Sequence, residues 1–402
     1  MPGALDGVRI LEFSEMIAAP FAGMHLGDLG ADIIKVEPPG GEPWRLTLPF
    51  APAESRVFMA LNRNKRDLAI DLKSTEGQEI IHRLVPAMDV VLVNYRPDTP
   101  KKLGIDYETL RELNPRLIYV ENSALGSRGD ESHRPGYDLV AQAVTGLLLT
   151  GQRVDDEGIP MPITPALADY GTGLTMAMAV CAALFARERT GVGQKIEATL
   201  LGTSLAFQGS GFLRTGTDSG AAEPSAASTT AIGRANSAYY RAYRTADSMI
   251  AIACLTPVLR RRFAEAVGVE DPRHVTAMVR GTPEHDEVSL SVAAQISARM
   301  AERTTAEWVH LFDSVGVPAG GVRSITEMAD DPQVLANDLV VEMEHPVTGT
   351  LAMVGPIVRM SETPTAAQLP PPTLGQHNAE ILAELGYGAP AIIDLREAGI
   401  VT

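Results

Sequence analysis

The chain has 402 residues, 45% of them hydrophobic and 21% charged, and its net charge is −16. This length allows two domains with a substantial core, and the composition is that of an ordinary globular protein. The acidic balance excludes nucleic acid as the main partner, because phosphate binding needs a broad basic face. The two cysteines, Cys181 and Cys254, lie in apolar runs, so we expect reduced core residues in a cytoplasmic protein.

The first two hundred residues alternate between short β-rich runs and amphipathic runs. We expect helices over 19–30 and 74–88, the second capped by Ser74, and a long helix in the charge-free run 171–186. The runs that predict strands are 8–13, 31–39, 67–72, 89–95, 116–123 and 194–200. Strands separated by helical runs are typical of βαβ units, so the predicted fold class is α/β with a mostly parallel sheet.

The second half of the chain differs in composition and in its predicted elements. Residues 215–236 are rich in Gly, Ser, Ala and Thr, which predicts a linker. The segment that follows predicts a smaller α+β domain, with a hairpin over 238–254 and helices over 257–267, 290–303 and 305–315. The tail predicts a hairpin over 339–355, turning at 348–349, and a last helix near 376–386.

Several common sites are disfavoured by missing patterns. The N-terminus lacks a basic region followed by an apolar stretch, and the uncharged run 172–186 is shorter than the roughly 20 residues of a membrane span. No H-x3-H, H-E-x2-H or C-x2-C spacing occurs, so no metal site is expected. No G-x-G-x-x-G follows a predicted strand and no G-x-S-x-G occurs, which disfavours a dinucleotide site and a serine hydrolase.

Two basic clusters stand out against the acidic background. The first contains Arg63, Lys65, Arg66 and Lys73, and the second contains Arg96, Lys101 and Lys102. Both flank predicted strands, and ligands of parallel sheets bind at loops beyond the strand ends. The clusters therefore suit a polyphosphate such as the 3′-phospho-ADP of coenzyme A, with a solvated surface as the alternative.

A single carboxylate, Asp169, precedes Gly171 and Gly173 where the charge-free run begins. One interpretation is a helix cap that accepts backbone N–H bonds. The other is a nucleophile that attacks a thioester carbonyl in a site that excludes water. In that case the glycines let the substrate approach the backbone, and their N–H groups bind the oxyanion. The residues alone leave both interpretations open.

Many segments, in the right order, match one known family. They include "LEFSEMIAAPFAGMHLGDLGADIIKVEPPGGEPWR", "NRNKRDLAIDLK", "RPGYDLVAQAVTGLL", "PALADYGTGL" and "DDPQVLANDLVVEMEHP". On these segments the chain resembles, over essentially its whole length, the class III coenzyme A transferase family. This family, also called CaiB/BaiF, includes formyl-CoA transferases and α-methylacyl-CoA racemases.

The resemblance implies an overall architecture. A Rossmann-like large domain is built from 1–214 plus 326–402, and a small domain, 237–325, is reached through the linker 215–236. Two ring-shaped protomers interlock as a homodimer, and each active site lies between the large domain of one and the small domain of the other. The implied substrates are an acyl-CoA and a small carboxylic acid, with neither nucleic acid nor membrane as partner.

The resemblance also assigns residues. It makes Asp169 the catalytic aspartate, which forms a mixed anhydride with the donor acyl group and then an aspartyl-CoA thioester. It implies coenzyme A contacts at Ile70, Lys73, Asn94, Tyr95, Arg96, Lys102 and Leu103, places Ile17 near the thioester, and matches Tyr137 to an active-site tyrosine. Formyl-CoA transferases have glutamine at Ile17, arginine at Pro38 and a multi-glycine lid unlike "TTAIGRAN" (229–236). These differences favour a larger or less polar acyl group than formyl or oxalyl.

Two other functions remain as alternatives. The racemases of the family use the aspartate as a base beside a histidine and a glutamate, because racemisation moves protons on two faces of the α-carbon. Here Tyr137 stands at the histidine position and Thr256 near the glutamate position, and tyrosine, with a pKa of about 10, is a poor substitute. A CoA-binding protein without turnover has no need of Asp169. The transferase is therefore the favoured function.

Overall fold

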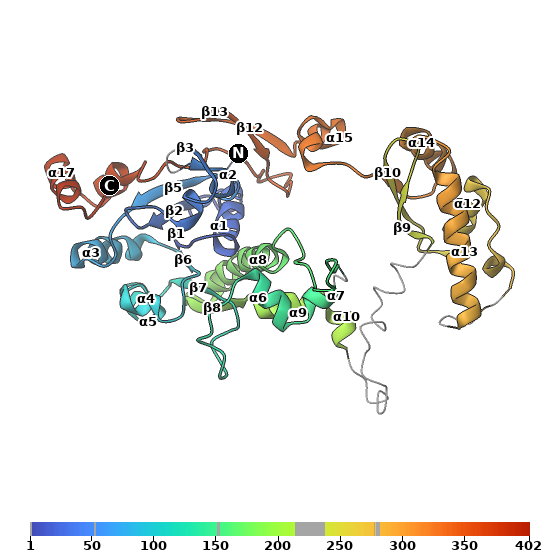
Figure 1. The fold of residues 1–402 in the computed structure, drawn as a ribbon. Helices are drawn as coiled ribbons and strands as arrows, with labels where there is room; N and C mark the ends of the chain where they lie inside the picture. The colour runs from blue at the N-terminus through green and yellow to red at the C-terminus, as the bar shows by residue number, and fades with distance from the viewer. Residues whose placement is uncertain (1, 52–53, 151–152, 214–237, 277, 279–281) are drawn as a thin grey trace. The chain divides into compact units, whose positions relative to one another are not determined.

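The computed structural model describes residues 2–51, 54–150, 153–213, 238–276, 278 and 282–402. The chain forms two compact units, one of Met1–Gly209 with Ala329–Thr402 and one of Ser210–Met328 (Figure 1). The predicted linker 215–236, which includes the stretch 229–236 compared above with the lid of formyl-CoA transferases, lies outside the described residues. Each unit has its own hydrophobic core.

A six-stranded sheet forms the centre of the large unit. In spatial order its strands are β5 (Lys65–Ala69), β2 (Asp32–Glu37), β1 (Arg9–Phe13), β6 (Val90–Val93), β7 (Ile118–Ser123) and β8 (Gln194–Thr199). Every pairing within it is parallel, so the α/β class is confirmed. The strand order reverses between β1 and β6, and doubly wound sheets bind their ligands at this switch point.

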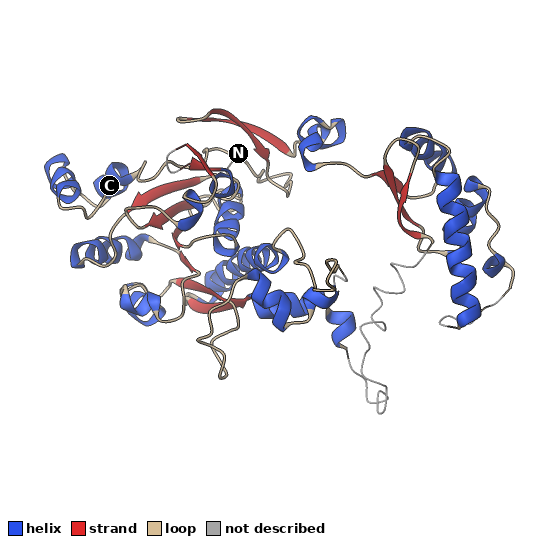
Figure 2. Ribbon diagram, viewed as in Figure 1, coloured by secondary structure: helices blue, strands red, loops and turns tan. Residues whose placement is uncertain are grey.

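Helices cover both faces of the sheet, giving three layers (Figure 2). One face packs against α1 (Ala18–Asp28) and α8 (Leu167–Thr190). The other packs against α3 (Thr75–Leu84), α5 (Tyr107–Leu113), α16 (Asn378–Glu384) and α17 (Ala389–Glu397). Because successive strand residues point to opposite faces, Ile10 of β1 contacts the first layer and Leu11 the second.

The remaining elements of the large unit are short. They are β3 (Pro49–Ala51), β4 (Glu54–Ser55), α2 (Arg56–Met59), α4 (Thr99–Lys102), α6 (Asp138–Val144), α7 (Leu147–Thr150), α9 (Leu200–Phe207), α15 (Pro332–Ala336), β12 (Val340–His345) and β13 (Gly349–Val354). A further short helix, α10 (Gly209–Phe212), spans the boundary between the two units. The predicted cap of α3 is confirmed, because Ser74 Oγ accepts the Gly77 N–H at 3.0 Å.

The central helix α8 is longer than its charge-free run. It has 24 residues, includes Arg187 and Arg189, and ends at Gly191, whose φ of 73° is the left-handed conformation that closes many helices. By length and composition it is the one helix in the described part of the chain that could cross a membrane. Its buried residues, such as Val180, pack instead against the sheet, as in the core helix of a globular protein.

The small unit contains an antiparallel three-stranded sheet and helices. Its elements are β9 (Tyr240–Arg244), β10 (Met249–Ala253), α12 (Pro257–Val267), α13 (Pro283–Met300), α14 (Thr305–Val315) and β11 (Ala319–Gly321). The predicted hairpin and two of the three predicted helices are confirmed. Helix α13 begins earlier than predicted, because Thr282 Oγ1 caps it by accepting the His285 N–H and Pro283 suits its first position.

Three details differ from the sequence-based expectations. Strand β5 begins at Lys65, two residues early, because pairing with β2 brings Lys65 opposite Ile33. Helix α17 was not predicted, and it is held through Ile392, which packs into the core. Of the two cysteines expected to lie in the core, Cys181 is only half-buried, while Cys254 is buried.

Candidate active site

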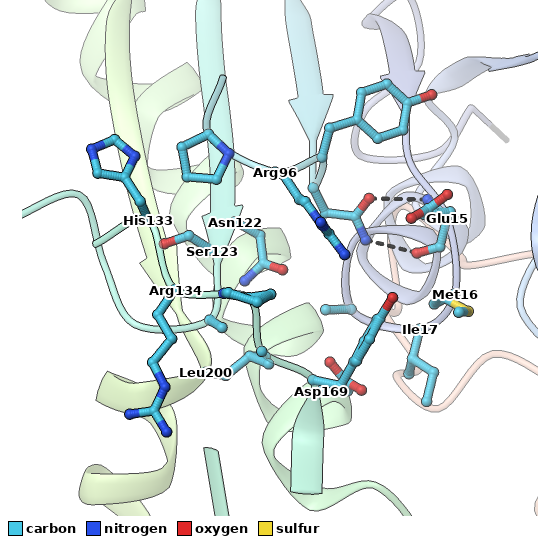
Figure 3. A pocket seen from close by; sticks show the side chains of 18 of the residues that line it. Glu15, Met16, Ile17, Arg96, Asn122, Ser123, His133, Arg134, Asp169 and Leu200 are labelled. Atoms are coloured by element: carbon cyan, nitrogen blue, oxygen red, sulfur yellow. Dashed lines mark hydrogen bonds between the residues drawn. The ribbon is translucent and has the colours of Figure 1, made fainter. Parts of the chain in front are cut away.

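A cleft of about 810 Å³, open to solvent, lies at the carboxyl edge of the sheet beside the switch point (Figure 3). It is lined by the segments 15–18 after β1, 94–97 after β6 and 122–124 at the end of β7, by the loop 132–137, and by Asp169 and Leu200. All of its lining residues belong to the large unit.

The structure brings some of the predicted site residues together and not others. The cleft contains Ile17, Asn94, Tyr95, Arg96, Tyr137 and Asp169. Outside it lie Ile70, Lys73, Lys102 and Leu103. Lys73 and Lys102 are exposed and follow β5 and β6, so they share the carboxyl edge with the cleft, as an elongated ligand would require. The side chain of Ile70 is buried in the core and that of Leu103 packs against it.

Asp169 is the third residue of α8, and the carboxylate faces the cleft. In the view of Figure 3 it lies between Ile17 and Leu200, with Arg96 above it. Among the described residues its carboxylate has no hydrogen-bond or ion-pair partner. Burial, and then the negative charge of Asp138, raise the pKa of Asp169 to about 7. A carboxylate kept free and poorly solvated in a cleft is a candidate nucleophile or base.

The cap of α8 is a residue that the sequence analysis missed. Asp138, the first residue of α6, accepts the N–H groups of Ala168 at 2.7 Å and Asp169 at 3.2 Å through Oδ1. Its Oδ2 accepts the side-chain amide of Gln142. The capping interpretation of Asp169 is therefore wrong, because Asp138 supplies the cap and leaves the other carboxylate free. The sequence feature that could have identified Asp138 is its position directly after Tyr137 in "PGYD".

The glycines after Asp169 do not have the role in substrate and oxyanion binding that was predicted from the sequence. A Cβ on Gly173 would lie 2.6 Å from the backbone oxygen of Ala18, and one on Gly171 would lie 2.4 Å from the ring of Phe207. These glycines permit close packing of α8 on α1 and α9. Both are inside the helix, where their N–H groups bond to the preceding turn, so the expectation of an oxyanion contact from them is wrong.

The first basic cluster is not a polyphosphate site. Arg63 and Lys65 are at most 1% exposed, and they form ion pairs with Asp28 and Glu12 respectively. Arg66 is bound by Asp32, Glu380 and Glu384. That prediction is therefore wrong for these three cations, whose charges are paired with carboxylates of the large unit. Lys73 is the one exposed cation of the cluster.

The second cluster contributes to the cleft in two ways. Arg96 is exposed and lines the cleft. Asn94, just before the cluster, binds the backbone instead: its side chain accepts the Glu15 N–H at 2.9 Å and donates to the Glu15 carbonyl at 2.7 Å (dashed in Figure 3). Tyr95 is half-buried, and burial raises the pKa of its hydroxyl. The cleft is also lined by two residues absent from the sequence analysis, His133 and Arg134, which no sequence pattern had distinguished.

Comparisons with known proteins agree with this geometry. The family model for CoA-transferase family III matches residues 5–378. The chain belongs to CoA-transferase family III. It is 35% identical to the succinyl-CoA:glutarate CoA-transferase of Mus musculus, over 99% of this chain and 90% of the mouse protein. It is 34% identical to the succinate–glutarate CoA-transferase of Agrobacterium fabrum, over 95% of each.

Solved structures support the same assignment. The crystal structure of a CaiB/BaiF family protein from Brucella suis matches with a TM-score of 0.79 and 28% identity, over 96% of this chain and 100% of that one. The enzyme is therefore a family III CoA-transferase, and CoA thioesters are its substrates. In the described part of this CoA-transferase, no group of three or more His, Cys, Asp or Glu side chains is arranged to hold a metal ion.

Proposed function

We propose that this CoA-transferase moves coenzyme A from an acyl-CoA to a free carboxylic acid through covalent intermediates on Asp169. The observation that carries the proposal is the carboxylate of Asp169, which is desolvated and unpaired among the described residues in a cleft at the switch point of the sheet. Asp138 supplies the helix cap, so Asp169 is free for chemistry.

The reaction balances without any other reactant. An oxygen of Asp169 attacks the donor thioester carbonyl, the C–S bond breaks, and a mixed anhydride and CoA thiolate form. The thiolate attacks the Asp169 carbonyl, releases the donor acid and leaves an aspartyl-CoA thioester. The acceptor carboxylate attacks that thioester to give a second anhydride, and the thiolate then takes the new acyl group and regenerates Asp169. Each step exchanges one activated acyl bond for another.

The cleft suits this chemistry because it lowers the solvation of the nucleophile. The raised pKa of Asp169 reflects burial first, and a poorly solvated carboxylate attacks carbonyl carbon more readily than one in bulk water. Attack requires the anion, so the enzyme gains activity as pH rises through the pKa of Asp169.

The substrates we propose to test first are the CoA thioesters and free acids of four- and five-carbon dicarboxylic acids. Two relatives are named for succinate and glutarate. The guanidinium of Arg96, which lines the cleft, suits the second carboxylate of such a substrate. Lys73 and Lys102, exposed on the same edge, are proposed to bind the phosphates of coenzyme A.

We also propose the quaternary state that the family resemblance implies, an interlocked homodimer of cytoplasmic enzyme. Light scattering after size-exclusion chromatography measures this directly. A mass of about 86 kDa, twice the 42.8 kDa of one chain, supports the dimer. A mass equal to one chain contradicts it, without bearing on the chemistry at Asp169.

The racemase alternative requires a second proton-transfer group near Asp169. His133 lines the cleft, but its ring is turned away from Asp169 in Figure 3. Thr256, at the position of the racemase glutamate, caps α12 by accepting the Leu259 N–H. These observations favour acyl transfer over proton transfer.

The decisive experiment is chemical trapping during turnover. We expect enzyme incubated with succinyl-CoA, glutarate and hydroxylamine to carry a hydroxamate on Asp169, located by peptide mass spectrometry. The Asp169→Asn protein is the control and should carry none. Full turnover with no adduct on Asp169 would contradict the proposal, and solvent deuterium entering the α-carbon of an acyl-CoA would favour the racemase.

A further inference from the structure

The segment 14–17, between β1 and α1, contributes Glu15, Met16 and Ile17 to one wall of the cleft and holds an unusual backbone conformation. Met16 has a φ of 65°, in the left-handed region that non-glycine residues avoid at a cost of about 1–2 kcal/mol. The next residue, Ile17, immediately precedes α1 and lines the cleft beside Asp169. A strained residue at this place requires contacts that hold it.

Three side chains bind the backbone of three consecutive residues in this segment. Lys35 Nζ donates to the Ser14 carbonyl at 2.9 Å. Asn94 binds both the N–H and the carbonyl of Glu15. The strained residue itself is bound by Glu42, whose Oε2 accepts the Met16 N–H at 2.8 Å. Side chains of the large unit therefore fix the backbone of residues 14–16 by hydrogen bonds.

Glu42 is well fixed for this contact. It is 2% exposed, its Oε1 lies 3.2 Å from Lys35 Nζ, and its own N–H donates to Glu37 Oε2 at 2.8 Å. A buried carboxylate is costly unless it is paired, and Lys35 supplies the pair. Glu42 does not line the cleft, so it touches no substrate there, whereas the residues it holds do.

We propose, building on the acyl-transfer function above, that Glu42 is a positioning residue: its carboxylate holds Met16 in the left-handed conformation and thereby places the Met16–Ile17 wall opposite Asp169. Rate in acyl transfer depends on the alignment of the reacting groups, and a displacement of about 1 Å can cost about 10²-fold. Glu42 therefore acts on turnover through the backbone of the wall. Binding of the distant nucleotide of coenzyme A does not depend on it.

The first test is the isosteric variant Glu42→Gln. In the carboxylate, Oε2 accepts the Met16 N–H while Oε1 lies beside Lys35 Nζ. The amide has an oxygen at only one of these two positions, so its N–H₂ group must face either the Met16 N–H or Lys35 Nζ. We expect kcat to fall about tenfold or more while the Kd for coenzyme A stays within about twofold. The matched control is Glu54→Gln, another buried glutamate of the same unit that does not touch the wall. Its kcat should stay within about twofold of wild type.

A second variant keeps the test valid if Glu42→Gln fails to fold. Glu42→Asp keeps the charge that Lys35 requires but is one methylene too short to keep both contacts. We expect it to fold and to lose kcat without loss of CoA binding. A kcat equal to that of Glu54→Gln in both Glu42 variants would overturn the proposal.

The backbone explanation has its own test in a double-mutant cycle. Glycine adopts the left-handed conformation without cost, so loss of the Glu42 contact should reduce kcat less in a Met16→Gly background than in wild type. An equal loss in both backgrounds would overturn the proposal. These outcomes are distinct from failure of the proposed function, in which wild-type enzyme itself would show no CoA transfer.

Discussion

Asp138 caps the helix that carries Asp169, and the two carboxylates meet at one helix end: Oδ1 of Asp138 accepts the Asp169 N–H at 3.2 Å. This arrangement has two consequences. It satisfies the N–H groups at the start of α8, so the carboxylate of Asp169 stays free. It also sets a negative charge beside that carboxylate, which adds to burial in raising its pKa.

The first prediction concerns the pH dependence of turnover. Because the proposed acyl transfer requires the Asp169 anion, kcat should rise with pH through an apparent pKa of about 7. Asp138→Asn keeps an oxygen for the helix N–H groups and removes the charge, so the rise should move to lower pH. The shift should be partial, because burial is the largest cause and remains. Steady-state kinetics between pH 5 and 9 measure it.

The control for that experiment is Asp155→Asn, an exposed acid that does not line the cleft. Its profile should match wild type. A profile of the Asp138→Asn enzyme that coincides with wild type would show that Asp138 does not act on Asp169 through charge.

The second prediction is that the Asp169 carboxylate lowers the stability of the fold. The pKa of Asp169 is raised in the native state, so the native protein binds more protons than the unfolded chain between about pH 4 and 7, and stability falls as pH rises through that window. Asp169→Asn removes the ionisable group and therefore this loss of stability with rising pH. We expect the variant to be inactive but to have a higher Tm than wild type at pH 8.

The size of that gain is limited. The full shift of about three pKa units corresponds to about 4 kcal/mol as an upper bound, and the measured gain should be smaller because the side chain is only partly buried. The gain should shrink toward pH 4, where Asp169 is protonated in the fold. Thermal unfolding at both pH values measures it, and a gain independent of pH would refute this explanation.

The third prediction separates two basic residues that look alike in the sequence. Arg63→Gln leaves Asp28 buried without its arginine, so it should cost about 3–5 kcal/mol of stability and leave the Kd for coenzyme A unchanged. Lys73→Gln should do the opposite, weakening coenzyme A binding about tenfold at unchanged stability, because the proposed charge-assisted contact of this exposed lysine with a phosphate is lost. Calorimetric titration and denaturant unfolding measure the pair.

Dephospho-CoA is the matched ligand for Lys73. If this lysine binds the 3′-phosphate, the Lys73→Gln substitution should not weaken the binding of dephospho-CoA, which lacks that phosphate. Equal weakening of both ligands would place Lys73 on another group of coenzyme A.

The fourth prediction tests the packing role of the glycines in α8. Gly173→Ala should destabilise the enzyme by about 1–3 kcal/mol, because the new Cβ would lie 2.6 Å from the backbone oxygen of Ala18. The control is Gly209→Ala, where no atom lies within 4 Å of the added Cβ. Denaturant unfolding compares them, and equal stability of the two variants would contradict the close approach of α1 and α8.

Much of the fold followed from local pattern. Alternating β-rich and amphipathic runs predicted the strands of the parallel sheet, and the helix from 257 to 267 was predicted to the residue. The predictions that failed concern elements that depend on tertiary contacts. Pairing with β2 extends β5 to Lys65, and packing of Ile392 stabilises α17, which the sequence pattern did not predict. Periodicity is a local property, and it cannot report contacts made far along the chain.

The candidate site divides in the same way. The sequence by itself determined that Asp169 begins an apolar helix and that basic residues follow the strands. Only the tertiary structure decided that Asp138, 31 residues away, caps that helix, that Arg63 and Lys65 are buried in ion pairs, and that Glu42 binds Met16. The physical reason is that a charged side chain takes its role from its partner and its burial, and both are set by chain segments that meet only after folding.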